Sequence, residues 1–169
     1  MNDIQTSCCF TGHRSGRLPW LSNPNDWRTQ ALTDTLWQQI LTSYEEGYRT
    51  FLCGMARGVD LLCAQLVLQL QEEDPAVQLI PAIPFPGQAR NWPDRDREEY
   101  EHILDRCREN TVIVSPAYTK FCFLQRNRYM VDHSSKVIGV FDGLPKGGTY
   151  QTLEYARKKQ LKMELILPE

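Results

Sequence analysis

The sequence predicts an α/β fold: a single Rossmann-like, three-layer domain with a mostly parallel open sheet and helices on both faces. Short apolar runs alternate with longer amphipathic stretches along the whole chain. The connections between them are short, which favours consecutive βαβ units. The length of 169 residues is that of one ordinary domain. Residues 1–169 are therefore expected to fold as one unit.

The first half of the chain predicts three strands separated by two helices. Residues 7–11 form a short apolar run that ends at Gly12, as a buried strand does. The first helix is expected to begin at the Asn25-Asp26 cap and to end before Gly47. Apolar runs and helical spacing then predict a strand, a helix and a strand at residues 50–53, 58–73 and 77–83.

The second half continues this alternation. A charged helix is expected over residues 94–107. Residues 111–115 are as β-branched and apolar as a strand buried on both faces should be. Residues 118–124 are expected to form a loop or a short helix. A helix, a strand, a helix and a strand complete the chain at residues 126–133, 136–141, 149–160 and 163–167.

Composition and charge exclude several classes of protein. With 19 Lys+Arg against 21 Asp+Glu, the net charge of −2 gives no overall attraction to a polyanion. Nucleic-acid binding would therefore need a local basic patch. No apolar run reaches the roughly 18 residues of a membrane span, and the first residues lack a secretory pattern. The six cysteines form no CxxC pair and lie mostly in apolar segments. We therefore expect a cytoplasmic protein with buried free thiols and no metal site.

Glycine and arginine recur where the predicted strands end. In open parallel sheets, ligands bind beyond the carboxyl ends of the strands, near the topological switch point. The residues that follow the strands are therefore the candidate ligand-binding residues. They are Thr11, Gly12, His13 and Arg14; Gly54, Met55, Ala56, Arg57, Gly58 and Asp60; Arg126, Asn127, Arg128 and Asp132; and Gly147, Gly148 and Thr149.

These residue types indicate recognition of an anion. A glycine-rich turn that enters a helix lets backbone N–H groups approach a phosphate, and arginine adds planar paired donors. We expect one crevice that holds a phosphorylated, nucleotide-sized ligand, with Arg14, Arg57 and Arg128 facing into it. Neither GxxxxGK[ST] nor GxGxxG is present, which disfavours a Walker-type ATPase and a conventional NAD dehydrogenase.

Several of these residues also have a structural explanation, and the sequence leaves both open. Each glycine turn could serve only tight strand-to-helix geometry. His13 could act as an acid or base or could hydrogen-bond its own loop. Asp60 could contact a ligand or cap its helix. Asp132 could bind a ribose hydroxyl or pair with Arg126 or Arg128.

The motifs resemble those of a known superfamily. Residues 54–60 (GMARGVD) resemble the G-[LM]-A-x-G-[IV]-D signature of DNA-processing protein A, and residues 125–130 resemble its R-N-R element. With the initial TGHR and the later Gly147-Gly148-Thr149, residues 7–167 resemble the YpsA-like branch of the SLOG superfamily. The resemblance implies a cytosolic Rossmannoid module that binds a phosphorylated nucleotide or nucleotide-derived molecule as a sensor or regulator.

Two alternatives come from neighbouring families of this superfamily. Residues 147–154 resemble the P-G-G-x-G-T-x-E motif of the Lonely Guy phosphoribohydrolases, although they lack its third glycine and have one extra residue. By that resemblance Glu154 would be the catalytic carboxylate in N-glycosidic hydrolysis, and Arg128 would orient the phosphate. DNA-processing protein A implies single-stranded DNA binding instead. The sequence predicts no cofactor besides the nucleotide-type ligand, and it leaves homo-oligomerisation open.

Overall fold

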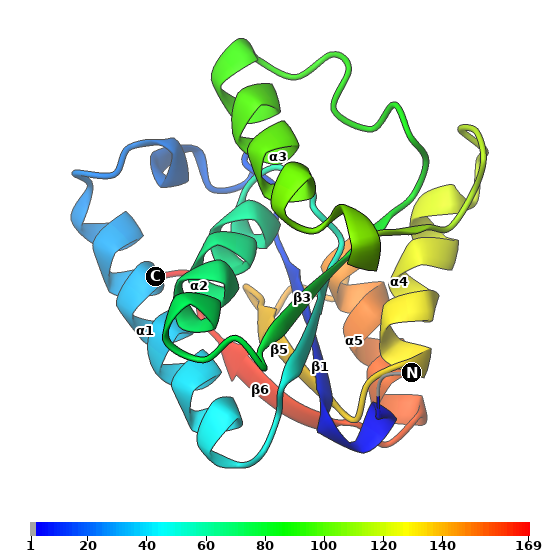
Figure 1. The fold of residues 1–169 in the computed structure, drawn as a ribbon. Helices are drawn as coiled ribbons and strands as arrows, with labels where there is room; N and C mark the ends of the chain where they lie inside the picture. The colour runs from blue at the N-terminus through cyan, green and yellow to red at the C-terminus, as the bar shows by residue number, and fades with distance from the viewer. Residues whose placement is uncertain (1–2) are drawn as a thin grey trace.

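The computed structural model describes residues 3–169 and contains one six-stranded sheet (Figure 1). The strand order is β4-β3-β2-β1-β5-β6, and every neighbouring pair is parallel. Met1 and Asn2, the first two residues of the predicted domain, lie outside the described residues. The strands are β1 (Ser7–Gly12), β2 (Thr50–Cys53), β3 (Gln78–Ile83), β4 (Val112–Ile113), β5 (Lys136–Val140) and β6 (Lys162–Ile166). The predicted α/β, Rossmann-like fold with a parallel sheet is confirmed.

Helices cover both faces of this sheet (Figure 1). The five α-helices are α1 (Trp27–Glu45), α2 (Val59–Glu73), α3 (Asp94–Arg106), α4 (Cys122–Asp132) and α5 (Gly148–Lys158). Helices α1 and α2 pack against one face together with α3, whereas α4 and α5 pack against the other. Three short 3-10 helices, η1 (Ile4–Thr6), η2 (Pro19–Ser22) and η3 (Arg108–Asn110), lie in connections. Among the described residues, no helix is both long and apolar enough to cross a membrane.

Residues 8–10 of the central strand β1 are all apolar, and burial on both faces of the sheet explains this. Cys8 and Phe10 point into the core beneath α1 and α2, whereas Cys9 points into the core beneath α4 and α5. All three side chains are fully buried. Since side chains alternate between the two faces of a strand, a strand covered on both faces is apolar at each position.

The fourth strand differs from the sequence prediction. Residues 111–115 were expected to form a strand buried on both faces, but β4 has only two residues and lies at the edge of the sheet. Ile113 is 52% exposed. The backbone N–H groups of Val114 and Ser115 still donate to the carbonyl oxygens of Ile83 and Pro84, at 3.0 and 3.1 Å. The segment therefore follows β3 as a bent edge rather than as a central strand.

The chain order places a switch point between β1 and β5. From β1 the chain moves outward through β2, β3 and β4, and it then returns to the other side of β1 to form β5 and β6. The loops that leave β1 and β5 therefore diverge at their carboxyl ends. This divergence is where open parallel sheets leave room for a ligand.

Candidate functional site

A cleft of about 280 Å³ opens at the carboxyl ends of β1 and β5. We call it the switch-point cleft. The loop after β1, the start of α2, the buried side of α4 and the N-terminus of α5 form its walls. It brings together most of the predicted ligand-binding residues: Thr11, Gly12, His13, Arg14, Ala56, Asp60, Arg126, Asn127, Gly147, Gly148 and Thr149.

Tight packing of two loops explains part of the glycine pattern. Arg14 and Gly58 form an antiparallel backbone bridge between the loop after β1 and the loop after β2. Gly58 has a φ of +104°, and a Cβ there would lie 2.7 Å from the backbone nitrogen of Ser15. A Cβ on Gly12 would lie 2.6 Å from Cγ1 of Val59. These two glycines are therefore required by the packing around the cleft, whether or not a ligand binds.

Arg126 is buried in the wall of the cleft and is only 4% exposed. Its Nη1 donates a hydrogen bond to the carbonyl oxygen of Gly54, and its Nε donates to Oδ1 of Asn127 at 2.7 Å. Within residues 3–169, these bonds leave the donors of Nη2 for another partner. Burial lowers the pKa of Arg126, and the nearby carboxylate of Asp60 opposes this effect.

Asp60 holds the loop after β2 in place. Its carboxylate accepts a hydrogen bond from the backbone N–H of Ala56 at 3.1 Å. Burial raises the pKa of Asp60, and the positive charge of Arg126 opposes the increase. This geometry is that of a side chain that organises a loop at a helix start, one of the two roles that the sequence leaves open.

The N-terminus of α5 faces the cleft without a side-chain cap. Gly147, the N-cap residue, has a φ of +93° and makes no side-chain hydrogen bond to the helix. Gly148 and Thr149 follow it and also line the cleft. The first N–H groups of a helix have no partner within the helix, and the helix dipole places partial positive charge there. The helix end therefore offers donors to an anion.

His13 contacts Asp142 in two ways. Its Nε2 accepts a hydrogen bond from the backbone N–H of Asp142 at 3.1 Å and lies 3.4 Å from Oδ2 of the same residue. Burial lowers the pKa of His13, although the carboxylate of Asp142 opposes this effect. His13 therefore links the loop after β1 to the loop after β5, rather than to its own loop alone.

Arg17, which was not among the predicted ligand-binding residues, also lines the cleft. Its guanidinium forms an ion pair with Asp142. The predicted motif stopped at Arg14, but the next residues are Ser15, Gly16 and Arg17. Gly16 and Arg17 repeat the glycine and arginine of Gly12 and Arg14 after the same strand. This repetition was the signal that could have identified Arg17.

The structure does not place Arg57 and Arg128 in the cleft with Arg14. Nε of Arg57 lies 2.7 Å from Oδ2 of Asp96 on α3, and Arg57 lines a larger cavity on the α1–α2–α3 face. Arg128 stacks on Tyr155, 5.1 Å from its ring centre, in a separate pocket of about 290 Å³ between α4 and α5. The expectation of a single crevice lined by all three arginines is therefore corrected.

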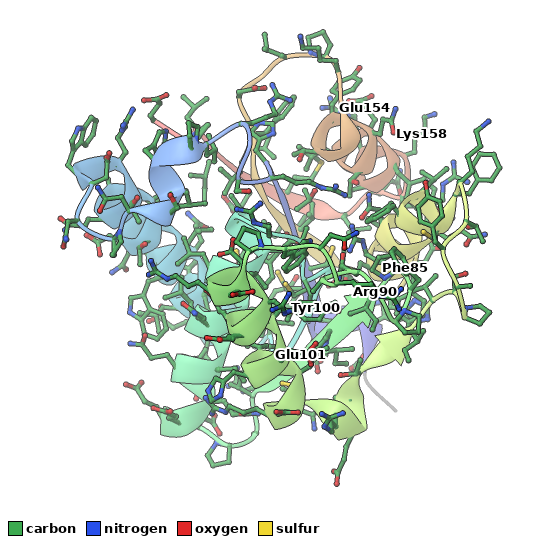
Figure 2. All side chains as sticks on the ribbon, turned by 90° about the horizontal axis from the view of Figure 1, so that it is seen from above. Phe85, Arg90, Tyr100, Glu101, Glu154 and Lys158 are labelled. Atoms are coloured by element: carbon green, nitrogen blue, oxygen red, sulfur yellow. The ribbon has the colours of Figure 1, made fainter. Side chains whose placement is uncertain are left out.

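Other predicted residues also lie outside the cleft lining. Glu154 forms an ion pair with Arg157 at 3.3 Å on α5, and it lines neither the switch-point cleft nor the α4–α5 pocket (Figure 2). Asp132 accepts a hydrogen bond from the hydroxyl of Tyr155 at 2.7 Å. Met55 is fully buried in the core. The carboxylate that the phosphoribohydrolase alternative needs is therefore not positioned in the cleft.

The described residues contain no group of three or more His, Cys, Asp or Glu side chains that could hold a metal ion. All six cysteines are free and buried. Burial raises the pKa of Cys9 to about 12, and it also raises the pKa of Cys53. Since the thiolate is the reactive form, these two thiols are poor nucleophiles at neutral pH.

Comparisons with known proteins agree with the fold. The family described as the YspA SLOG family (YpsA) matches residues 8–169. A UPF0398 protein of Halalkalibacterium halodurans is 32% identical over 124 residues, which cover 73% of this chain and 66% of that protein. The UPF0398 protein YpsA of Bacillus subtilis is 27% identical over 123 residues, 72% of this chain and 68% of that protein.

Two solved structures share the fold at low sequence identity. DNA processing protein A from Streptococcus pneumoniae matches with a TM-score of 0.60 and 15% identity, over 95% of this chain and 50% of that one. DNA processing protein A from Helicobacter pylori, described in terms of its single-stranded DNA binding mode, matches with a TM-score of 0.61 and 20% identity. That match covers 96% of this chain and 66% of the other.

Proposed function

The chain belongs to the YpsA family of SLOG proteins, and from this premise we propose that its switch-point cleft binds the phosphate end of a nucleotide or nucleotide-derived molecule. One observation carries the proposal. The buried guanidinium of Arg126 and the uncapped N-terminus of α5 line the same cleft. Buried cations are costly unless they are paired, and no carboxylate lies within ion-pair distance of Arg126 among the described residues. An anion in the cleft would supply the missing partner.

The local charge supports an anionic ligand despite the net charge of −2. Arg14, Arg17 and Arg126 line the cleft, and Arg17 is paired with Asp142. Among residues 3–169, Asp60 is the only acidic residue in the lining. The carboxylate of Asp60 already accepts a hydrogen bond from the protein. Arginine side chains and helix N-termini both donate N–H groups to phosphate oxygens, and the two can bind the same phosphate together.

The cleft is large enough to hold only part of a nucleotide. Ligand pockets usually exceed about 300 Å³, and the cleft has about 280 Å³. Asn127 lines both the cleft and the α4–α5 pocket, which also contains Arg128 and Tyr155. The remainder of the ligand would extend toward that pocket, where the ring of Tyr155 offers an aromatic surface.

Replacing Gly148 by proline tests the proposal at a single N–H group. Proline is tolerated at the first position of a helix, and Gly148 occupies that position in α5. An added Cβ meets nothing within 4 Å. Gly148→Pro removes one donor and should weaken binding about tenfold, the cost of one hydrogen bond to a charged group. Calorimetric titration with AMP, ADP-ribose and inorganic phosphate measures the loss.

Gly148→Ala is the matched control, because it changes the side chain and keeps the N–H group. It should bind the same nucleotide as tightly as the unchanged protein. If no anionic nucleotide binds the unchanged protein at millimolar concentration, the proposal is wrong. Equal losses in the two variants would also contradict it, because they would show that the N–H group is not a ligand.

A second candidate function is binding of single-stranded DNA, and a specific surface favours it. Tyr118 and Phe121 are 66% and 56% exposed in the segment that leads into α4. Lys120 lies over the ring of Phe121, and Arg14 lies 4.9 Å from the ring centre of Phe123. Exposed aromatic rings interleaved with cations are typical of surfaces on which successive bases stack.

A further inference from the structure

A second cavity lies away from the switch-point cleft, on the opposite side of the loop after β1. It has a volume of about 620 Å³ and is bordered by η2, α1, α2 and α3. Helix α2 lies between α1 and α3 in Figure 1. We call it the three-helix cavity. The bridge between Arg14 and Gly58 separates it from the cleft: Arg14 lines the cleft, and Gly58 lines the cavity.

Three polar side chains of this cavity donate their hydrogens to other groups of the protein. The hydroxyl of Thr29 donates to the carbonyl oxygen of Trp20 at 2.9 Å, and that of Thr33 donates to the carbonyl oxygen of Thr29 at 2.7 Å. The amide of Gln65 donates to Oε1 of Glu99 at 2.8 Å. A hydroxyl that donates to a carbonyl still has lone pairs to offer. These side chains therefore present acceptors to the cavity.

The charged side chains of the cavity also favour a cationic ligand. Asp34, Asp96 and Glu99 line it, against Arg57 and Arg95. Asp96 and Arg57 are engaged with each other at 2.7 Å. Within the described part of the chain, Glu99 forms no ion pair. Burial and, to a lesser extent, the neighbouring Asp96 raise the pKa of Glu99, and Arg95 opposes them. A half-buried carboxylate that forms no ion pair favours binding of a cation.

The cavity also has an apolar wall. Leu21, Leu61 and Leu62 line it beside the acceptors. A bare inorganic cation would leave this surface unused, because hard metal ions bind oxygen atoms alone. An organic body that carries an ammonium or guanidinium group would use both surfaces, since binding pockets combine an apolar lining with a few placed polar groups.

We propose that the three-helix cavity binds a small organic cation, an amine or guanidine with an apolar body, whose charged group lies against Glu99 and the hydroxyl acceptors of α1. This site is separate from the phosphate site, and it does not depend on the proposed function. All three helices contribute to this site: hydroxyl oxygens come from α1, leucine side chains from α2 and the carboxylate of Glu99 from α3.

Calorimetric titration with matched probes tests this proposal. Tyramine and 4-hydroxyphenylacetate share a phenol body and differ in the sign of the charge, and agmatine adds a guanidinium. The cationic probes should bind, and the anionic probe should not. Glu99→Gln should weaken binding of the cations about tenfold, the effect of losing one charge-assisted hydrogen bond.

Glu101→Gln is the matched control on the same helix. Glu101 lies on α3 but does not line the cavity (Figure 2), so this substitution should leave binding unchanged. The proposal is overturned if no cationic probe binds at millimolar concentration, if the anionic probe binds as well as tyramine, or if the two variants lose equal affinity. Gly148→Pro should not change amine binding, which separates this result from a failure of the phosphate site.

Discussion

At the scale of single residues, the same glycines can serve packing and ligand access. Gly58 allows the loop after β1 to lie directly against the start of α2, and this contact forms one edge of the cleft. A Cβ added at Gly148 would meet no atom within 4 Å, and Gly148 lines the cleft at the start of α5. From the sequence, Gly58 and Gly148 were both predicted to belong to a phosphate-binding pattern. Only the surroundings of each Cα distinguish a packing glycine from a donor glycine.

Gly58→Ala should therefore destabilise the protein. The backbone at Gly58 has a φ of +104°, and the new Cβ would lie 2.7 Å from a backbone nitrogen and 3.0 Å from two further backbone atoms. We expect the free energy of unfolding to fall by about 2 kcal/mol or more, because backbone strain and a backbone clash act together. Urea denaturation measures the change.

Gly148→Ala is again the control, because the same chemical change there meets open space. It should leave stability unchanged or raise it slightly, since alanine restricts the unfolded chain more than glycine does. If the two alanine variants have equal stability, the explanation of Gly58 by packing is wrong.

The arginines show what residue types alone could predict. The sequence predicted that Arg14 and Arg126 lie near the carboxyl ends of the strands, and both residues line the cleft there. It could not separate Arg126 from Arg128, although two residues along a helix turn a side chain by about 200°. One therefore enters the wall of the cleft, and the other lies beside Tyr155. Arg57 pairs with Asp96, a partner from a distant part of the chain that no local pattern identifies.

At the scale of elements, apolar runs bounded by glycine predicted β1, β2 and β5 well, because these strands are covered on both faces. The run at residues 111–115 has the same composition but lies at the sheet edge, where only β3 is its neighbour. A strand at the edge of a sheet has one neighbouring strand and a central strand has two, and the composition of a strand does not distinguish these positions. Helix α4 begins at Cys122, four residues before its predicted start, with Phe121 as its N-cap residue.

The segment before α4 also provides the test of DNA binding. If this surface stacks bases, Phe121→Ala should weaken binding of an oligothymidine about tenfold, because one base–aromatic contact contributes about 1–3 kcal/mol. Affinity should also fall steeply as salt is raised. Fluorescence anisotropy with a labelled oligonucleotide measures both effects.

Trp27→Ala is the matched control, because Trp27 is 70% exposed at the start of α1, which packs on the other face of the sheet. It should leave the affinity for the oligothymidine unchanged. A flat salt dependence, or an equal effect of the two substitutions, would remove single-stranded DNA as a ligand of this surface.

At the scale of the whole molecule, the end of the sheet opposite the cleft is held by a charged cluster. Lys136 at the start of β5 is fully buried, and its Nζ donates to Oε1 of Glu46 at 2.8 Å. Lys162 at the start of β6 also donates to Glu46, which follows the last residue of α1. The cluster therefore connects α1 to two strands. It fixes the end of the sheet that carries no candidate site.

Glu46→Gln should destabilise the protein at neutral pH by about 2 kcal/mol, because it leaves the buried ammonium of Lys136 without a charged partner. Hydrogen bonds from Lys136, and then from Lys162, lower the pKa of Glu46. A carboxylate with a lowered pKa stabilises the folded state at pH values above its pKa in the unfolded chain, which is about 4.3. This contribution is lost as pH falls through the folded pKa.

Urea denaturation at neutral pH and again below about pH 4 checks both statements. The difference in free energy of unfolding between the unchanged protein and Glu46→Gln should shrink at the lower pH. Glu45→Gln, one residue earlier on the exposed side, should have little effect at either pH. A difference that stays constant with pH would exclude the ion pair as its cause.

The shortness of β4 has a consequence for how the protein behaves at high concentration. An exposed sheet margin can act as a template on which a foreign extended peptide aligns and aggregation begins. Here one margin has a strand of only two residues, and Val114 and Ser115 extend its hydrogen bonds to β3 along a bent edge. The other, β6, carries Lys162 and Glu164, whose charges oppose burial beneath an added strand. The β4 margin is therefore too short to align a long added strand, whereas the β6 margin leaves Leu165 52% exposed and has only these two charges to oppose fibrous self-association.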